Sequence, residues 1–262
     1  MWDPQVYLQF ESERTRPVQD LLSRLDVVAP TRVVDLGCGT GTSTRLLSRR
    51  WPQADVLGVD SSARMLAAAL REPAPPGSGE PRYELGDAAA WRSGTSVDVL
   101  FSNALLQWVP GHLELFGGWV QDLAPGGRLA FSVPDNFDEP AHLLLARVCA
   151  AAPWSGLLDG RVQRRSDRVH SLPVYADSLL ATGADVEAWT TTYLHRLTGP
   201  DPVLAWMSGT GLRPVLTALE ADPAAAQEFL ETYRAMLREA YPADRAGATP
   251  MPFRRLFVVA RV

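Results

Sequence analysis

Apolar residues recur along this chain in two alternating patterns. Short apolar runs, the pattern of buried strands, cover 32–36, 54–60, 82–87, 96–102 and 128–133. Apolar positions with helical spacing lie before and between these runs, at 4–13, 18–25, 61–69 and 112–123, and a further helical pattern opens at Thr42. Strands that alternate with helices predict an α/β fold with a parallel sheet covered on both faces.

The alternation ends near residue 134. Helical patterns follow at about 139–151, 174–182, 201–208 and 222–240, and strands are predicted at 186–194 and 253–260. The segment between these two strands is longer than a connection requires, which favours a helical cap over an active site. We therefore expect a single domain, 1–262, divided into a core and a cap. The predicted sheet core covers 30–133, 174–195 and 253–262, and the predicted cap covers 1–16, 138–172 and 196–250.

Local signals predict where several elements begin and end. Pro17 suits the first turn of a helix whose inner face carries Val18, Leu21, Leu22 and Leu25. Ser61 and Ser62 can cap the predicted helix at 61–69. Pro125-Gly126-Gly127 would close the helix at 112–123. The proline- and glycine-rich stretch 71–80 predicts a mobile surface loop.

The stretch with the most chemical content is Arg32-Val-Val-Asp-Leu-Gly-Cys-Gly-Thr-Gly41. It predicts a buried strand, a turn with Gly37, Gly39 and Gly41 at alternate positions, and a helix that starts near Thr42. Glycines let the backbone approach a ligand closely, and the helix N-terminus directs N–H groups to the same place. The spacing differs from the G-x-G-x-x-G of dinucleotide-binding folds.

A second acidic position strengthens this prediction. The next predicted strand ends at Asp60, where such folds present a carboxylate to ribose hydroxyls. Together, Val-Asp35-Leu-Gly-Cys-Gly-Thr-Gly41 and Gly58-Val-Asp-Ser-Ser-Ala-Arg-Met65-Leu resemble motifs I and II of the class I S-adenosylmethionine-dependent methyltransferases. That resemblance implies a Rossmann-like sheet with an antiparallel last strand, and S-adenosylmethionine as cofactor. The residues expected to bind the cofactor are Asp35, Gly37, Gly39, Gly41, Asp60, Ser61, Met65, Asp87, Ala88 and Asn103.

The composition of the chain excludes several kinds of binding partner and catalytic chemistry. A net charge of −5 provides no basic surface for phosphate backbones, so nucleic acid is not expected as a partner. All 25 basic residues are arginine, which excludes a lysine Schiff base and a Walker A loop. Cys38 and Cys149 are too few for a disulfide framework, and no metal site is predicted. With no signal-peptide pattern and no long apolar run, we expect a cytoplasmic protein that does not enter a membrane.

A wider resemblance concerns the substrate. Segments that run from Trp2-Asp-Pro-Gln-Val-Tyr-Leu-Gln-Phe10 to Pro252-Phe-Arg-Arg-Leu-Phe257 resemble trans-aconitate 2-methyltransferases. They include Asn103-Ala-Leu-Leu-Gln-Trp-Val-Pro110, Pro134-Asp-Asn-Phe137, Trp189-Thr-Thr-Thr-Tyr-Leu-His195 and Gly209-Thr-Gly-Leu-Arg-Pro214. The resemblance implies esterification of a tricarboxylate. The loop at 73–81 and the segment 161–168 match no part of it, and the second of these leaves one wall of the pocket undefined.

Physical chemistry adds roles to that reaction. A carboxylate is ionised at pH 7, so its methylation needs no general base, and His112, His142, His170 and His195 are expected to be structural. Charge disappears as a carboxylate and a sulfonium become neutral products, so a strong cationic clamp would stabilise the ground state more than the transition state. The reacting carboxylate should therefore meet neutral donors, and Trp108 and Gln107 are the predicted catalytic residues.

Arginines are predicted to hold the remaining carboxylates, because their guanidinium groups match carboxylates bidentately. The predicted substrate-binding residues are Tyr7, Arg14, Arg16, Tyr193, Arg213, Arg254 and Arg255. Since adjacent strand residues face opposite sides, at most one of Arg254 and Arg255 should reach the ligand.

The sequence leaves three alternatives open. The first is a methyltransferase of the same fold acting on another small carboxylic acid or metabolite. The second is a nicotinamide-dependent oxidoreductase, which the glycine spacing disfavours, and the third is a binding module without activity. Base-directed DNA methylation is disfavoured because Ala104-Leu105 follows Asn103 in place of a Pro-Pro-aromatic run.

Overall fold

The structure, a computed structural model, describes residues 11–158 and 169–262. Contacts divide the chain into two compact units. The sheet unit contains Arg14–Pro134, Arg168–Thr191 and Arg255–Val262, and the helical unit contains Met1–Glu13, Asp135–Asp167 and Thr192–Arg254. The long strands β6 (Asp185–Leu197) and β7 (Thr249–Arg261) contribute residues to both units.

One seven-stranded sheet has the order β3-β2-β1-β4-β5-β7-β6. Its other strands are β1 (Arg32–Leu36), β2 (Asp55–Asp60), β3 (Arg82–Leu85), β4 (Val97–Asn103) and β5 (Leu123–Pro134). β1 to β5 pair in parallel, and β7 pairs antiparallel with β5. The predicted α/β fold with an antiparallel last strand is therefore confirmed.

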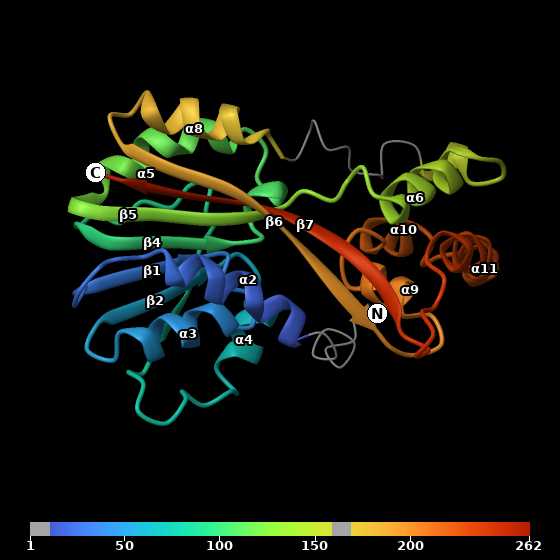
Figure 1. The fold of residues 1–262 in the computed structure, drawn as a ribbon, viewed down its shortest axis with the longest axis horizontal. Helices are drawn as coiled ribbons and strands as arrows, with labels where there is room; N and C mark the ends of the chain where they lie inside the picture. The colour runs from blue at the N-terminus through green and yellow to red at the C-terminus, as the bar shows by residue number, and fades with distance from the viewer. Residues whose placement is uncertain (1–10, 159–168) are drawn as a thin grey trace. The chain divides into compact units, whose positions relative to one another are not determined.

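Helices cover both faces of this sheet. In the sheet unit they are α2 (Glu11–Ser23, mostly in this unit), α3 (Thr42–Arg50), α4 (Ala63–Ala69), the 3₁₀ turns η1 (Leu106–Trp108) and η2 (His112–Leu115), α5 (Phe116–Gln121) and α8 (Leu172–Leu180). α5 and α8 lie on one face, and α2, α3 and α4 lie on the other (Figure 1). The central strands are buried on both sides, which agrees with the mostly apolar sequences of β1 and β4.

The order of the strands places the ends of four of them along one edge. β3, β2, β1 and β4 are neighbours and parallel, so their carboxyl ends lie side by side. Strand order reverses at β1, where the chain goes outward to β2 and β3 and then returns to β4. Open α/β sheets bind ligands at such a switch point, outside the carboxyl ends of the strands.

The helical unit has an apolar core of its own. Its helices are α6 (Pro140–Ala150), α7 (Ser155–Leu158), α9 (Pro202–Ser208), α10 (Arg213–Ala218) and α11 (Pro223–Ala240). α11 buries Phe229, Tyr233 and Leu237, which recur at the spacing of one helical face. Phe229 meets Trp154 edge to face at 5.4 Å between ring centroids. The Tyr233 hydroxyl donates to the Ala141 carbonyl at 2.7 Å, which joins α11 to α6.

Several predicted boundaries were wrong. Pro17 lies inside α2, not in its first turn, although the predicted inner residues of that helix are buried. Pro125-Gly126-Gly127 belongs to β5, because the N–H of Gly126 donates to the carbonyl of Val262 at 2.8 Å and extends the pairing with the chain end. The last strand begins at Thr249, earlier than predicted, and β3 ends at Leu85. The short helices α7 and α10 were not predicted.

Candidate active site

Asp35 lies in β1, just before the glycine turn, and is hydrogen-bonded to the start of α3, just after it. This side chain is fully buried, and its Oδ2 accepts hydrogen bonds from Ser43 Oγ at 2.6 Å and Thr44 Oγ1 at 2.7 Å. Burial raises the pKa of the Asp35 carboxyl to about 7, against the opposing effect of the two hydroxyls. Asp35 was predicted among the cofactor-binding residues; it has no exposed surface, and both of these hydrogen bonds join it to the start of α3.

The three glycines of the turn have different roles. All have positive φ, at +72° for Gly37, +56° for Gly39 and +78° for Gly41, a region that side chains disfavour. A Cβ on Gly37 would meet Leu105 Cδ1 at 2.7 Å, and one on Gly41 would overlap the Tyr83 hydroxyl. A Cβ on Gly39 would have no atom within 4 Å. Gly37 and Gly41 are thus required by packing, whereas Gly39 faces open space.

Asp60 links this turn to the end of β2. Its Oδ2 accepts from the backbone N–H of Gly39 at 2.9 Å, and its Oδ1 accepts from that of Ser62 at 2.8 Å. Asp60 is partly exposed, Ser61 is exposed and Met65 is partly buried. The Ser62 hydroxyl caps α4 by accepting from the Met65 N–H at 3.4 Å, as the sequence predicted. Asp60 therefore presents a carboxylate beside the outward-facing Gly39.

The loop after β3 contains Asp87 and Ala88, two of the residues predicted to bind the cofactor. Asp87 is exposed, and its Oδ1 accepts from the Ala89 N–H at 3.0 Å, while Ala88 is buried. The Gly86 N–H donates to the backbone carbonyl of Asp60 at 3.1 Å. Asp87 and Ala88 thus follow directly on the same sheet edge as Asp60.

A strained turn follows β4. Asn103 Oδ1 accepts from Ser132 Oγ at 2.6 Å, and Ala104 has a φ of +59°, a conformation that costs a residue with a side chain roughly 1 kcal/mol. Gln107 is buried, and its Nε2 donates to the Ala104 carbonyl at 2.7 Å. The amide of Gln107 was predicted as a donor to substrate, but here it holds the strained turn in place.

Trp108 differs from its neighbour because its side chain is 45% exposed. Within the described part of the chain, its indole N–H has no hydrogen-bond partner. Trp108 lies in η1, just beyond the carboxyl end of β4, on the edge that also carries the glycine turn. The predicted donor is therefore available at this edge.

The histidines have structural surroundings. His112 is buried with both ring nitrogens engaged, and burial lowers its pKa. Burial also lowers the pKa of His142, to about 4, and His195 is buried among Tyr193, Trp206 and Phe253. Across residues 11–158 and 169–262, His, Cys, Asp and Glu form no group able to hold a metal ion. No helix in these ranges is both long and apolar enough to cross a bilayer.

The predicted substrate-binding residues have varied environments. In the sheet unit, Arg16 is exposed on α2 and Arg255 is buried. In the helical unit, Arg213 is exposed at the start of α10, whereas Arg254 Nε pairs with Asp135 Oδ2 at 2.9 Å.

The remaining predicted substrate-binding residues are Tyr193, Tyr7 and Arg14. Tyr193 is buried and stacks on the His195 ring, with 6.1 Å between centroids. Tyr7 lies outside the described residues, as does the segment 161–168, and Arg14 lies on α2 with a side chain outside the description.

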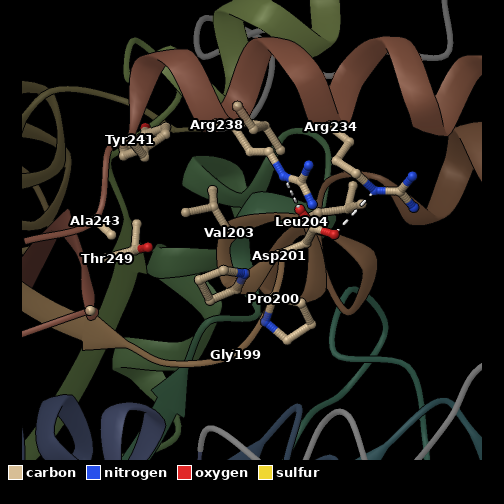
Figure 2. A pocket seen from close by; sticks show the side chains of 13 residues that line it. Gly199, Pro200, Asp201, Val203, Leu204, Arg234, Arg238, Tyr241, Ala243 and Thr249 are labelled. Carbon is tan, nitrogen blue, oxygen red and sulfur yellow. Dashed lines mark hydrogen bonds and ion pairs between the residues drawn. The ribbon is translucent and has the colours of Figure 1, made fainter.

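The helical unit also contains a pocket that the sequence did not reveal. Its volume is about 270 Å³. Asp201 lies between two arginines of α11, with Oδ1 at 2.7 Å from Arg238 Nε and Oδ2 at 3.2 Å from Arg234 Nε (Figure 2). Apolar atoms of Val203, Leu204 and other residues complete the lining. The i, i+4 spacing of the two arginines was a signal, but the partner aspartate comes from a distant loop.

Comparisons with known proteins agree with this geometry. The family profile described as "Methyltransferase domain" matches residues 33–127, which run from β1 into β5. Among solved structures, an S-adenosylmethionine-dependent methyltransferase from Mesorhizobium loti has a TM-score of 0.51 and 23% identity, with 93% of this chain and 96% of that chain covered. This similarity supports the fold.

Curated relatives match from end to end. The trans-aconitate 2-methyltransferase of Streptomyces coelicolor is 49% identical over 99% of this chain and 86% of its own length. That of Methylobacterium nodulans is 46% identical over 99% of this chain and 98% of its own length. Identity at this level, across both the sheet unit and the helical unit, shows common descent. The chain therefore belongs to the trans-aconitate 2-methyltransferase family.

Proposed function

We propose that this enzyme transfers a methyl group from S-adenosylmethionine to a carboxylate of trans-aconitate and so forms a methyl ester. The observation that carries the proposal is the full-length identity to relatives of that name. The methyltransferase profile ends at residue 127, whereas the relatives also match the whole helical unit. Substrate choice in a common fold depends on such additional elements.

The sheet edge suits the proposed cofactor. S-adenosylmethionine supplies an electrophilic methyl group on a positively charged sulfur. The open space at Gly39 allows close backbone approach, and the Asp60 carboxylate has lone pairs left for ribose hydroxyls. Ser61, Met65, Asp87, Ala88 and Asn103 are proposed to complete this site. In this proposal Asp35, Gly37 and Gly41 shape the turn without touching the ligand.

The protein's task in the reaction is alignment, because proton transfer is not required. A carboxylate with a pKa near 4 is already the reactive anion at neutral pH. One of its oxygens forms the new bond to the methyl carbon as the carbon–sulfur bond breaks, and the electron pair stays on sulfur. Holding the two reactants in line removes much of the entropic barrier. The proposed reaction therefore assigns no proton transfer to the buried histidines His112 and His142.

The charge change in the reaction favours Trp108 as the contact to the reacting carboxylate. A positive side chain there would lose much of its interaction as the carboxylate becomes an ester. An indole N–H orients the oxygen with a weaker, neutral hydrogen bond. Trp108 is exposed and available for this role, whereas Gln107 is proposed to act indirectly by holding the Ala104 turn.

For the other carboxylates of the substrate, Arg213 and Arg16 are the stronger candidates. Both are exposed. Arg254 already has an anionic partner in Asp135, and Arg255 is buried. A free guanidinium loses less on binding a carboxylate than one that must first leave an ion pair.

Mass spectrometry tests the proposal directly. The purified protein is incubated with S-adenosylmethionine and trans-aconitate, and in parallel with citrate and with a monocarboxylic acid. We expect a monomethyl ester of trans-aconitate to form fastest, and we expect Gly39→Val to abolish it while the protein remains folded. Faster methylation of another acid would replace the proposed substrate, and no methylation of any acid would refute carboxylate esterification.

A further inference from the structure

A buried chain of hydrogen bonds lies behind the segment that carries Trp108. His112, which begins η2, is 3% exposed, and Tyr175 of α8 is 0% exposed. His112 Nδ1 lies 2.9 Å from the carbonyl oxygen of Val109, and His112 Nε2 lies 3.0 Å from the hydroxyl of Tyr175. We call this pair of residues the His112–Tyr175 strut.

The chemistry of the partners assigns the protons. A carbonyl oxygen can only accept, so His112 Nδ1 carries the hydrogen that points to Val109. The neutral ring then accepts at Nε2, and the Tyr175 hydroxyl donates to it. The backbone N–H of His170 donates in turn to the Tyr175 oxygen at 3.3 Å. Every polar atom of the His112 ring is thus satisfied in a single arrangement.

The rings around the strut give it little freedom to move. Tyr175 stacks on the His112 ring at 5.6 Å between centroids and meets Phe131 of β5 edge to face at 5.2 Å. Phe116 of α5 lies 6.2 Å from each of the His112 and Tyr175 rings. The strut therefore connects the loop after β4 to α8 and to the central sheet.

The segment it supports is buried at Leu106, Gln107 and Val109, and its own backbone hydrogen bonds are local. The backbone N–H of Trp108 donates to the Leu105 carbonyl at 2.8 Å, and the backbone N–H of Val109 donates to the Leu106 carbonyl at 3.0 Å. These bonds close turns within the loop and do not tie it to another element. The bond from His112 to the carbonyl of Val109, which follows Trp108 directly, reaches an element outside η1.

We propose that His112 and Tyr175 are positioning residues that hold Trp108 at the carboxyl end of β4, acting through the Val109 carbonyl. This inference rests on the proposed function, in which Trp108 orients the reacting carboxylate. Loss of the strut should leave cofactor and substrate binding in place and slow the methyl transfer. A simple packing role for the same aromatic residues would change stability without that selective effect.

The test compares two buried tyrosines. Tyr175→Phe keeps the ring and removes the hydroxyl of the strut, and Tyr233→Phe removes a similarly buried hydroxyl, bonded to Ala141 in the helical unit. We expect Tyr175→Phe to lower kcat roughly tenfold or more with each KM changed less than about twofold. Tyr233→Phe, matched for loss of a buried hydrogen bond, should leave kcat unchanged. Equal kcat values for the parent and Tyr175→Phe would overturn the proposal.

A double variant asks whether the effect passes through Trp108. In a Trp108→Phe background, Tyr175→Phe should lower kcat by less than about twofold, because the residue it positions is already gone. If the two substitutions multiply as independent effects do, the strut does not act through Trp108 and the proposal fails.

A spectroscopic measurement separates this inference from the proposed function. With 5-fluorotryptophan incorporated, the Trp108 fluorine signal is assigned by its loss in Trp108→Phe. We expect this signal to shift or broaden in Tyr175→Phe and to be unchanged in Tyr233→Phe. If the parent methylates no acid but this signal responds, the proposed function is wrong and the structural coupling is right. An unchanged signal would overturn the coupling itself.

Discussion

The carboxylate of Asp60 accepts a hydrogen bond from the backbone N–H of Gly39 at 2.9 Å, so the end of β2 holds the tip of the turn that follows β1. The second oxygen of the same carboxylate accepts from the Ser62 N–H at 2.8 Å. One side chain thus connects the glycine turn to the start of α4. This arrangement gives Asp60 a structural role in addition to its proposed contact with the ribose.

Replacement of Asp60 tests both roles. We expect Asp60→Ala to lower the affinity for S-adenosylmethionine tenfold to about a hundredfold, because a charged hydrogen-bond partner worth about 1.5–3 kcal/mol is lost. Isothermal titration calorimetry measures the affinity. Asp55→Ala is the matched control, since Asp55 begins the same strand and pairs with Arg82 at 2.7 Å on the exposed surface. Equal affinities for both variants would contradict the proposed contact.

The glycines of the turn should respond differently to alanine. Gly39→Ala adds a methyl group to open space and should cost only about 1 kcal/mol of unfolding free energy, from the positive φ. Gly37→Ala adds a collision with Leu105 to the same strain and should cost about 1–3 kcal/mol more. Urea unfolding of the two variants gives both values. If Gly39→Ala were the less stable of the two, our division of the turn would be wrong.

Asp35 should make the stability depend on pH in an unusual direction. Burial raises the pKa of Asp35 in the folded protein from its ordinary value of 3.8 to about 7, so the folded state binds a proton that the unfolded state releases. The stabilisation is complete below pH 4 and is lost as the pH rises to 7, by roughly 1.4 kcal/mol per pH unit. Asp35→Asn removes this titration and keeps an oxygen acceptor.

Unfolding free energies of the parent and Asp35→Asn at pH 5, 6, 7 and 8 measure this effect. The parent should lose stability relative to the variant between pH 5 and 7, and the difference should level off above pH 7. Asp26→Asn serves as the control, because Asp26 is exposed and the neighbouring Arg128 lowers its pKa. A difference between parent and Asp35→Asn that does not vary with pH would show that Asp35 does not titrate in this range.

The arginine pair of α11 should depend on Asp201. We expect Asp201→Asn to lower the unfolding free energy by about 1 kcal/mol, because two guanidinium groups one helical turn apart lose their shared partner. Thermal unfolding at low and high salt measures the effect, which should shrink as salt screens the charges. Adding Arg238→Gln should recover part of the loss. A loss that is independent of salt would show that the effect does not come from the two ion pairs.

The proposed substrate contact of Arg213 predicts a specific kinetic change. Arg213→Ala should raise the KM for trans-aconitate about tenfold with little change in kcat, because a spectator carboxylate is bound alike in the ground and transition states. Arg196→Ala provides the control, since Arg196 is also exposed in the helical unit and pairs with Asp244 at 2.6 Å. Steady-state kinetics of the two variants would contradict the assignment if both KM values matched that of the parent.

The part of the fold that local signals define was predictable from the sequence. Apolar runs located β1, β2 and β4, and helical periodicity located α6, α8, α9 and α11 to within a few residues. Elements whose existence depends on distant partners were missed or misplaced. Pro125-Gly126-Gly127 reads locally as a turn, but pairing with Val262 makes it part of a strand.

In the candidate site, too, the sequence predicted the features that depend on local spacing and not those that depend on distant residues. The glycines and Asp60 were predicted because their spacing is itself the signal, whereas the different environments of Gly37, Gly39 and Gly41 depend on Leu105 and Tyr83, which lie far away in sequence. Gln107 and Trp108 are adjacent and were assigned the same role. One turns inward to the Ala104 carbonyl and the other outward, which is a result of packing that no local pattern encodes.

The sequence by itself determined the order of strands and helices, the position of the glycine turn and the family, since each depends on residue type and spacing along the chain. Only the tertiary structure decided that Asp35 is buried beneath the turn, that Asp60 holds Gly39, and that Tyr175 supports His112 behind the loop of Trp108. Those relationships join residues brought together by folding. Burial, hydrogen-bond partners and the pKa of a carboxyl are properties of such neighbours and not of the residue alone.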